Sequence, residues 1–238
     1  MPRSYTKSTS LPKIILSSWL TLSQTYKAPA LLSLSCLKDT CCVWDYISKD
    51  LVQMFTNPDG TCNDAARAAV RLGFHDAAAW SKTSGSGGAD GSLILSIDEI
   101  NRSENNGMQD IRLKAVGLLA KYAAWGVGAG DLAQYMHNVA TVVCPLGPRV
   151  LTLVGRKNSL FSNPNGLIPD TRASADDLIQ LFSDKTINFK DLIALIGAHT
   201  TAKQRFVDPS KAGQSLDSTP GVWDVKFYSE VLVPTPPS

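Results

Sequence analysis

Helical periodicity is the feature that most limits what this chain can fold into. From Cys42 to Phe55 apolar residues recur at helical spacing, every fourth position from Val43 onward, which predicts a helix with one apolar face. A Pro-Asp-Gly turn at residues 58–60 ends that stretch. Strand patterns are scarce throughout the sequence, and we therefore predict an all-α fold.

Helix-capping residues mark where further helices begin. Asn63, Ser174 and Asn188 each stand directly before a stretch with helical spacing, where a side-chain oxygen can accept the first free backbone N–H groups. The expected helices run from residue 64 towards Trp80, over residues 108–125 and 131–143, from residue 175 to Phe182, and from residue 189 into His199. After His199 we expect only loops, which end in a Pro-rich tail at residues 229–238.

Length and charge limit the class of protein. The 238 residues, of which 44% are hydrophobic, suffice for one domain with a substantial core. The 23 basic and 21 acidic residues leave a formal net charge of only +2. This balance gives no electrostatic reason to expect nucleic acid or an anionic membrane as a partner.

The five cysteines favour disulfide bonds. Cys36, Cys41, Cys42, Cys62 and Cys144 do not form the paired, closely spaced clusters of a thiolate zinc site. Disulfides in turn indicate an exported protein. The odd count leaves one thiol that is free, bridges to another molecule, or pairs with a cysteine outside this sequence.

The N-terminal segment carries an ambiguous targeting signal. Two lysines precede a short apolar run from Ile15 to Leu22, and two alanines, Ala28 and Ala30, follow where a cleavage site would lie. The run is too short to span a bilayer. It is either an atypical export signal or a poorly defined start of the chain, and the cysteines favour export.

Two of the three histidines, His75 and His199, close apolar helices. Arg71 lies four residues before His75, so both side chains project from one helix face and can converge on a single small ligand. Taken alone, such a pair is more often a solvated cationic stripe than a site. The surrounding motifs favour the site.

Three motifs in a fixed order resemble those of a known family. RLGFHD at residues 71–76, GADGS at 88–92 and ALIGAHT at 194–200 closely resemble the class II fungal secreted peroxidases of the plant, fungal and bacterial haem peroxidase superfamily. The resemblance extends from Cys41 to Tyr228. It implies the haem peroxidase fold for residues 36–228, with a distal lobe and a proximal lobe that is incomplete because full-length members continue well beyond this C-terminus. Residues 1–35 are then an atypical segment or signal.

The resemblance implies roles for residues on both sides of a haem b. His75 matches the distal base that moves a proton between the peroxide oxygens, and Arg71 the group that stabilises the developing charge. Asn105 matches the residue that orients this base, itself tied to a glutamate at the position of Glu99. His199 matches the proximal iron ligand. The aromatic residue beside the distal base corresponds to Phe74, while His137 matches no family position and is interpreted as an ordinary helix residue.

The resemblance also implies two calcium ions, because it matches oxygen ligands that are spread over long intervals of the sequence. The distal set is Asp76, Gly88, Asp90 and Ser92. The proximal set is Thr200, Asp217, Thr219, Val222 through its carbonyl, and Asp224. A plain turn rich in Asp, Ser and Thr would explain part of the second set but not both sets together.

The family pattern pairs Cys62 with Cys144 and matches an adjacent cysteine pair at residues 41 and 42. Cys36 could then bridge to Cys42, while the family partner of Cys41 lies in a C-terminal region that this chain lacks. The aspartate that accepts the N–H of the proximal imidazole in full-length members has no counterpart here either.

Several positions depart from the family's specialised members. Asp64, Ala68 and Arg205 stand where manganese-oxidising members have three carboxylates, so we expect no manganese site. Ala194 replaces the surface tryptophan of the high-potential ligninolytic members, and Leu216 replaces an aromatic residue that normally packs against the proximal imidazole. The pattern predicts a low-potential, generic peroxidase.

The leading hypothesis is therefore a secreted, monomeric peroxidase that uses hydrogen peroxide, haem b and two calcium ions to oxidise phenolic or aromatic donors, as in lignin degradation. One alternative is a non-enzymatic, calcium-stabilised haem-binding remnant. Another is a helical secreted interaction protein that has lost haem, against which the intact Arg71, His75 and His199 argue.

Overall fold

The computed structural model describes residues 13–15, 28–85 and 87–233, and their regular secondary structure is almost entirely helical. Two short strands, β1 (Lys13–Ile15) and β2 (Thr152–Val154), pair antiparallel. The α-helices are α1 (Leu34–Lys38), α2 (Cys42–Phe55), α3 (Asp64–Ala78), α4 (Ser92–Leu95), α5 (Ile97–Ile100), α6 (Gln109–Lys121), α7 (Ala129–Val143), α8 (Ala175–Asp184), α9 (Phe189–Ile196) and α10 (Lys226–Glu230). Short 3₁₀ helices cover Ser103–Asn105, Ala123–Trp125, Gly197–Thr201 and Pro209–Lys211.

The core lies where α3 packs against α7, and α2 contacts both of these helices. Gly73 permits the close approach of α3 to α7, because a Cβ at this position would lie 2.4 Å from the Cβ of His137. Tyr135 of α7 is buried against Trp44 of α2, where its hydroxyl donates to the Trp44 carbonyl at 3.1 Å. Helix α3 is therefore held rigidly, which matters because it carries Arg71 and His75.

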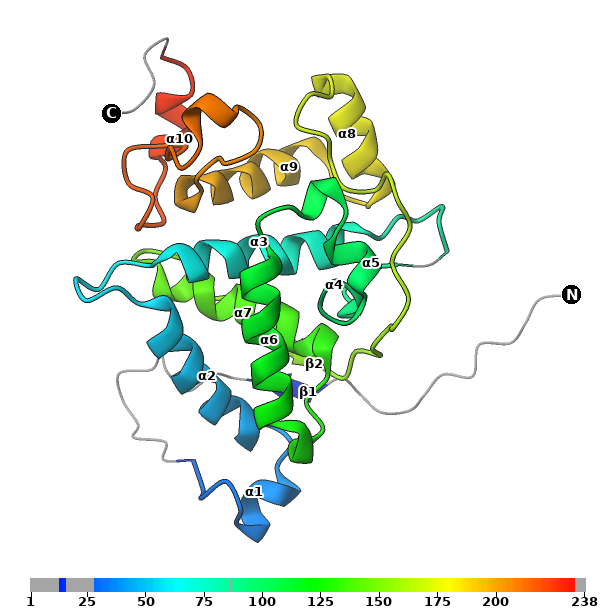
Figure 1. Ribbon diagram of the computed structural model, residues 1–238, viewed down its shortest axis with the longest axis vertical. Coiled ribbons are helices and arrows are strands. Elements are labelled where there is room, and N and C mark those ends of the chain that lie inside the picture. Colours follow the sequence, from blue (N-terminus) through cyan, green and yellow to red (C-terminus); the bar gives the residue numbers. More distant parts are fainter. Residues whose placement is uncertain (1–12, 16–27, 86, 234–238) are drawn as a thin grey trace, which may run out of the picture.

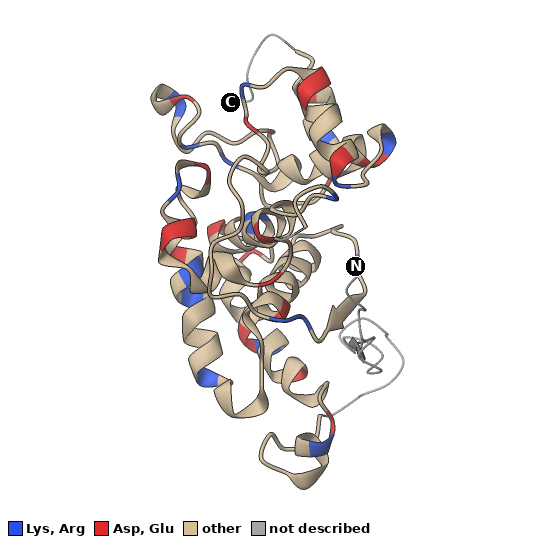
Figure 2. Ribbon diagram, turned by 90° about the vertical axis from the view of Figure 1, so that its right-hand side faces the viewer, with Lys and Arg blue, Asp and Glu red and all other residues tan. Residues whose placement is uncertain are grey.

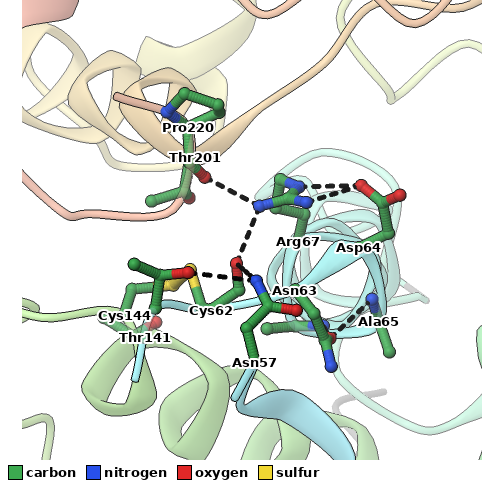
Figure 3. The surroundings of a disulfide bond; sticks show 12 residues. Asn57, Cys62, Asn63, Asp64, Ala65, Arg67, Thr141, Cys144, Thr201 and Pro220 are labelled. Atoms are coloured by element: carbon green, nitrogen blue, oxygen red, sulfur yellow. Dashed lines mark hydrogen bonds and ion pairs between the residues drawn. A yellow bond between two sulfur atoms is a disulfide. The ribbon is translucent and has the colours of Figure 1, made fainter. Parts of the chain in front are cut away.

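Two disulfides link the helices between residues 36 and 144. One joins Cys36 of α1 to Cys42 at the start of α2. The other joins Cys62, just before α3, to Cys144, which ends α7 (Figure 3). The second bridge fixes the N-terminal end of α3 relative to α7.

The segment from α8 to α10 lies on the opposite side of α3 from α2 (Figure 1). At one end of α3, Arg67 Nη1 donates to the Pro220 carbonyl at 2.9 Å. At the other end, Lys185 Nζ donates to the Trp80 carbonyl at 2.9 Å. These contacts, more than 100 residues apart in sequence, position the C-terminal segment against α3.

The predicted all-α fold is confirmed, with corrections at element boundaries. Helix α2 has the predicted bounds, and Asn63, Ser174 and Asn188 cap α3, α8 and α9 through their side chains. Helix α3 ends at Ala78, two residues short of Trp80. Helix α9, which was predicted to run into His199, ends at Ile196, and His199 lies in the 3₁₀ helix that follows. The expectation of loops alone after His199 was wrong, because α10 forms there.

Charged residues of both signs are interspersed along the chain (Figure 2). No helix in the described ranges is long and apolar enough to cross a membrane. The apolar run expected to be an export signal, apart from Ile15, and the end of the Pro-rich tail at 234–238 lie outside the described residues.

Candidate active site

Helix α3 brings Arg71 and His75 together. The Asn63 side chain caps the helix by accepting from two backbone N–H groups, and the regular helix that follows places both side chains on one face. Arg71 Nε lies 3.3 Å from His75 Nε2. A guanidinium can only donate, so this geometry requires an unprotonated Nε2 on His75.

The opposite nitrogen of His75 is fixed by Asn105. His75 Nδ1 lies 2.8 Å from Asn105 Oδ1, and Asn105 Nδ2 donates to the Glu99 backbone carbonyl at 2.7 Å. Because a carbonyl can only accept, it assigns the amide nitrogen of Asn105, and the amide oxygen therefore faces the imidazole. The proton of His75 thus resides on Nδ1, and Nε2 keeps a lone pair.

Glu99 acts on this network through its main chain. Its buried carboxylate instead accepts from the Asn163 backbone N–H at 2.7 Å. Asn163 also donates from its side chain to the Gly88 carbonyl at 3.2 Å. Sequence reasoning did not identify Asn163, because its role depends on a backbone N–H that any residue except proline supplies.

Two carbonyls of the turn after α5 hold the guanidinium of Arg71. Its Nη1 donates to Asn106 O and its Nη2 to Glu104 O, each at 2.7 Å. Gly107 in this turn has a φ of +86°, and a Cβ there would lie 2.8 Å from the Phe206 ring. The turn that orients His75 therefore also anchors Arg71.

The surroundings keep His75 neutral. Its side chain is only 8% exposed, and burial together with the Arg71 charge lowers its pKa to about 4. At near-neutral pH the ring is therefore neutral and oriented, with the Nε2 lone pair free to act as a base beside a fixed cation. Phe74 meets His75 edge to face and stacks on Phe182 of α8.

His199 is presented in the 3₁₀ turn after α9. Its Nδ1 donates to the Ile196 carbonyl at 2.9 Å, which leaves the Nε2 lone pair available for a metal. The Phe227 ring of α10 stacks on the imidazole, with centroids 5.3 Å apart. Sequence reasoning missed both partners, since one is a main-chain oxygen and the other lies on a helix that was not predicted.

His75 and His199 lie on separate elements, and no hydrogen bond within the described residues joins them. The two histidines offer what a haem site requires. His199 presents a nitrogen of the kind that binds iron, and His75 presents an unprotonated nitrogen beside a guanidinium. The two segments meet where Phe206 approaches Gly107 and where Arg67 reaches Pro220.

The distal oxygen set gathers at the end of α3. Asp76, fully buried, accepts from the Gly91 and Leu93 N–H groups, and Asp90 accepts from the Ser92 N–H. Burial, with a contribution from the Asp90 charge, raises the pKa of Asp76 to about 8. The buried Ser92 hydroxyl has no hydrogen-bond partner among the described residues. An orphaned hydroxyl beside crowded carboxyls fits a cation site.

The proximal oxygen set surrounds Thr200, the residue after His199. Its hydroxyl lies 2.6 Å from Asp217 Oδ2 and 3.1 Å from Asp224 Oδ1, and Thr219 contacts both carboxylates. One hydroxyl proton cannot serve two carboxylates, so a cation would relieve their mutual repulsion. Val222 joins the turn through its N–H, which donates to the Thr219 carbonyl.

Neither oxygen set is rich in charged ligands. No group of three or more His, Cys, Asp or Glu side chains suited to a metal occurs in the described part of the chain. A cation at either place would therefore depend on hydroxyl and carbonyl oxygens as well as carboxylates, which calcium accepts.

Comparison with known proteins identifies the family. The family model described as Peroxidase matches residues 47–233. Manganese peroxidase H4 of Phanerodontia chrysosporium is 34% identical over 199 residues, which cover 81% of this chain and 51% of that protein. A peroxidase of Arthromyces ramosus is 34% identical over 202 residues, 81% of this chain and 54% of its own.

Ligninase LG6 of Phanerodontia chrysosporium is likewise 34% identical over 197 residues, 79% of this chain and 52% of that protein. The chain thus spans about half the length of the curated relatives it matches. The family model alone covers well over half of the chain. The chain belongs to the peroxidase family.

Proposed function

We propose that this chain is a peroxidase that reduces hydrogen peroxide and oxidises phenolic or other aromatic donors. The observation that carries the proposal is the hydrogen-bonded series from Glu99 through Asn105 to His75, which leaves His75 Nε2 unprotonated beside Arg71. Relatives described as peroxidase, manganese peroxidase and ligninase support the same reaction class.

In this proposal His75 moves one proton and Arg71 stabilises charge. His75 Nε2 accepts a proton from the near oxygen of peroxide and delivers it to the far oxygen, so that the O–O bond breaks and water leaves. The Arg71 guanidinium stabilises the negative charge that develops on the departing oxygen. His199 would hold a haem b, which would supply the two electrons that this cleavage consumes and would regain them from two one-electron donor molecules.

We further propose that each oxygen set binds a calcium ion, one near each histidine. Asp76, Gly88, Asp90 and Ser92 would hold the distal ion; Thr200, Asp217, Thr219, Val222 and Asp224 would hold the proximal one. Calcium at the distal set would fix the end of α3 next to His75. Calcium at the proximal set would fix Thr200 next to His199.

The donor is proposed to be an organic molecule and not a manganese ion. Of the three positions at which manganese-oxidising members carry carboxylates, Ala68 has no ligand atom and Arg205 is a cation. Asp64 is already bound to Arg67 at 2.6 Å. With Ala194 also in place of a surface tryptophan, we infer a generic peroxidase of low potential.

Export and a monomeric state complete the proposal. The two disulfides support an oxidising compartment, since such bonds are rare in the cytosol. Recovery of the expressed chain from the culture medium rather than from the cells tests export, and size-exclusion chromatography with light scattering tests the oligomeric state.

The test is reconstitution with haemin and calcium, followed by peroxide-dependent oxidation of a phenolic dye. The native chain should develop a Soret band and turn over the dye. His75→Leu should keep the Soret band and lose about 2 to 4 orders of magnitude in rate, because only the proton transfer is removed. His199→Ala should weaken the Soret band itself.

A second candidate function is that of a calcium-stabilised haem-binding remnant without turnover. The exposed position of His199 and its carbonyl partner Ile196 favour this alternative, because a carbonyl makes the imidazole less basic than a carboxylate would. A full Soret band with a dye-oxidation rate equal to that of His75→Leu would identify the remnant.

A further inference from the structure

Three cations converge on one carboxylate near the start of α3. Arg67 Nη2 lies 2.6 Å from Asp64 Oδ1, Arg205 Nη2 lies 3.7 Å from Asp64 Oδ2, and Lys203 Nζ lies 4.0 Å from Asp64 Oδ1. Asp64 and Arg67 belong to the first turn of α3, whereas Lys203 and Arg205 follow the His199 turn. The cluster therefore bridges the two segments that carry the histidines.

The charges in this cluster do not balance. Arg67 satisfies Asp64 with two hydrogen bonds, from Nε at 3.0 Å and from Nη2 at 2.6 Å. Lys203 and Arg205 stand at the outer limit of ion-pair distance and form no hydrogen bond to Asp64. Among the described residues, no other carboxylate lies within 4.0 Å of either cation. The cluster of three cations and one carboxylate thus has a net charge of +2.

The loop that carries the two cations is fixed by its own hydrogen bonds. Gln204, between them, accepts from the Gly213 N–H and donates from its own N–H to the Gln214 carbonyl, at 2.8 and 2.9 Å. The Leu216 N–H donates to the Ala202 carbonyl at 3.0 Å, and Lys203 pairs with Ser215 in a β-bridge. The backbone that carries the two side chains is therefore fixed next to Asp64, so that binding need order only the side chains themselves.

An exposed aromatic residue directly follows these cations in the sequence. Phe206 follows Arg205 in sequence, is 54% exposed, and its ring lies against Gly107, in the turn whose neighbouring carbonyls bind Arg71. Val207, also exposed, extends the apolar surface. A cationic pair next to an exposed aromatic side chain, at the edge of the Arg71 turn, is complementary to a flat ring that bears a carboxylate.

We propose that Lys203 and Arg205 form a carboxylate-binding site that takes an aromatic acid as the electron donor. The inference rests on the proposed peroxidase function and specifies its substrate class. The guanidinium of Arg205 binds the carboxylate, Lys203 adds a second charge, and Phe206 contacts the ring. The carboxylates of a bound porphyrin carry the same chemistry, so the experiment separates these two sources.

The experiment measures equilibrium binding in the absence of peroxide, so that no turnover is needed. Ligand-observed NMR compares benzoate with benzamide, which has the same ring without the charge, on the haem-loaded, calcium-loaded chain. Benzoate should bind more tightly, and rising salt should remove the difference. The Lys203→Gln/Arg205→Gln double variant should weaken benzoate binding by about 5-fold or more and leave benzamide unchanged. Lys211→Gln, in the same loop but paired with Asp208, is the control and should have no effect.

A second measurement compares the affinity of each variant for haemin and for its dimethyl ester. If the double variant loses affinity for haemin alone and binds benzoate normally, the cations serve the porphyrin and the donor proposal is overturned. Equal binding of benzoate and benzamide would overturn it as well. If the chain fails to take up haem, the proposed peroxidase function is overturned. The comparison of benzoate with benzamide on the haem-free chain still tests the carboxylate-binding site.

Discussion

A single amide decides which nitrogen of His75 can act as a base. Asn105 is oriented by the Glu99 carbonyl, and it accepts from His75 Nδ1, so the lone pair faces Arg71. An imidazole without this partner would distribute its proton over both nitrogens and rotate. The buried pair of His75 and Asn105 therefore contributes orientation, which for a proton shuttle matters as much as pKa.

The pKa of His75 sets the acid limit of peroxide cleavage. The base must be unprotonated, so the rate should be constant near neutrality and fall as the pH drops through about 4. Burial is the main cause of the low pKa and the Arg71 charge the second, so Arg71→Leu should move the limit upward towards the ordinary histidine value of 6.5. Single-turnover rates and the NMR titration of the His75 ring report this shift.

Arg172→Leu, which removes an exposed arginine from a loop, is the matched control and should leave the titration unchanged. An acid limit that stays in place when Arg71 is replaced would show that the Arg71 charge does not depress the pKa of His75.

At the residue scale, the sequence reveals side chains with a motif but not main-chain partners. The spacing of Arg71 and His75 and the family pattern around Asn105 predict groups that the fold does place together. The carbonyl of Ile196 and the N–H of Asn163 have no sequence signature, because every residue has a carbonyl and nearly every residue an N–H. Their roles follow only from the path of the chain.

At the scale of elements, the close contact of α3 with α7 makes glycine more favourable than alanine at position 73, although alanine is normally preferred inside a helix. Gly73→Ala should destabilise the fold by about 1–3 kcal/mol, because the new methyl would overlap the Cβ of His137. Gly117→Ala on the exposed face of α6 meets no atom within 4 Å and should stabilise by about 0.5–1 kcal/mol. Urea denaturation of both variants measures the two signs; a stabilised Gly73→Ala would refute the close packing of α3 on α7.

The junction of α3 with α4 provides a test of the distal calcium ion. Without calcium, Ser92→Ala should be neutral or stabilise by up to about 1 kcal/mol, because it removes a buried hydroxyl that has no partner. With calcium, the same variant should lose much of the stabilisation that the ion gives the native chain. Thermal unfolding with and without a chelator measures this change of sign.

Ser96→Ala is the matched control for this comparison. The Ser96 hydroxyl bonds to Ser162 and caps α5, so its loss should destabilise equally in both conditions. If Ser92→Ala destabilised the chain to the same extent with and without calcium, the Ser92 hydroxyl would not be a ligand.

Elements with a long apolar face could be predicted, and short ones could not. Helix α2 repeats its apolar residues over fourteen residues and was predicted with its observed bounds. Helix α10 has five residues, fewer than two turns, so no periodicity can be recognised, and tertiary contacts must determine its structure. The Tyr228 hydroxyl supplies one such contact by donating to the Ile193 carbonyl.

At the scale of the whole molecule, the position of His199 relative to His75 depends on a few tethers between the C-terminal segment and α3. Arg67 is the most connected of them, because it binds Asp64, Cys62 O and Pro220 O at once (Figure 3). Next to it, the Cys62 N–H donates to the Gly221 carbonyl at 3.1 Å. The disulfide at Cys62 makes the α3 side of this junction rigid, so any loosening there must involve the C-terminal side.

Arg67→Met should therefore open this junction locally without unfolding the core. It leaves the Pro220 carbonyl without its donor, at a cost of about 1–2 kcal/mol, so hydrogen exchange at the Cys62 and Trp223 amides should accelerate by roughly 5- to 30-fold. Amides in the middle of α7 should exchange as before. Lys49→Met, which breaks an exposed ion pair with Asp45 on α2, is the control and should change neither region. Uniform acceleration across α7 and the junction would mean instead that Arg67 supports the whole fold, and that the two histidine-bearing segments unfold as one unit.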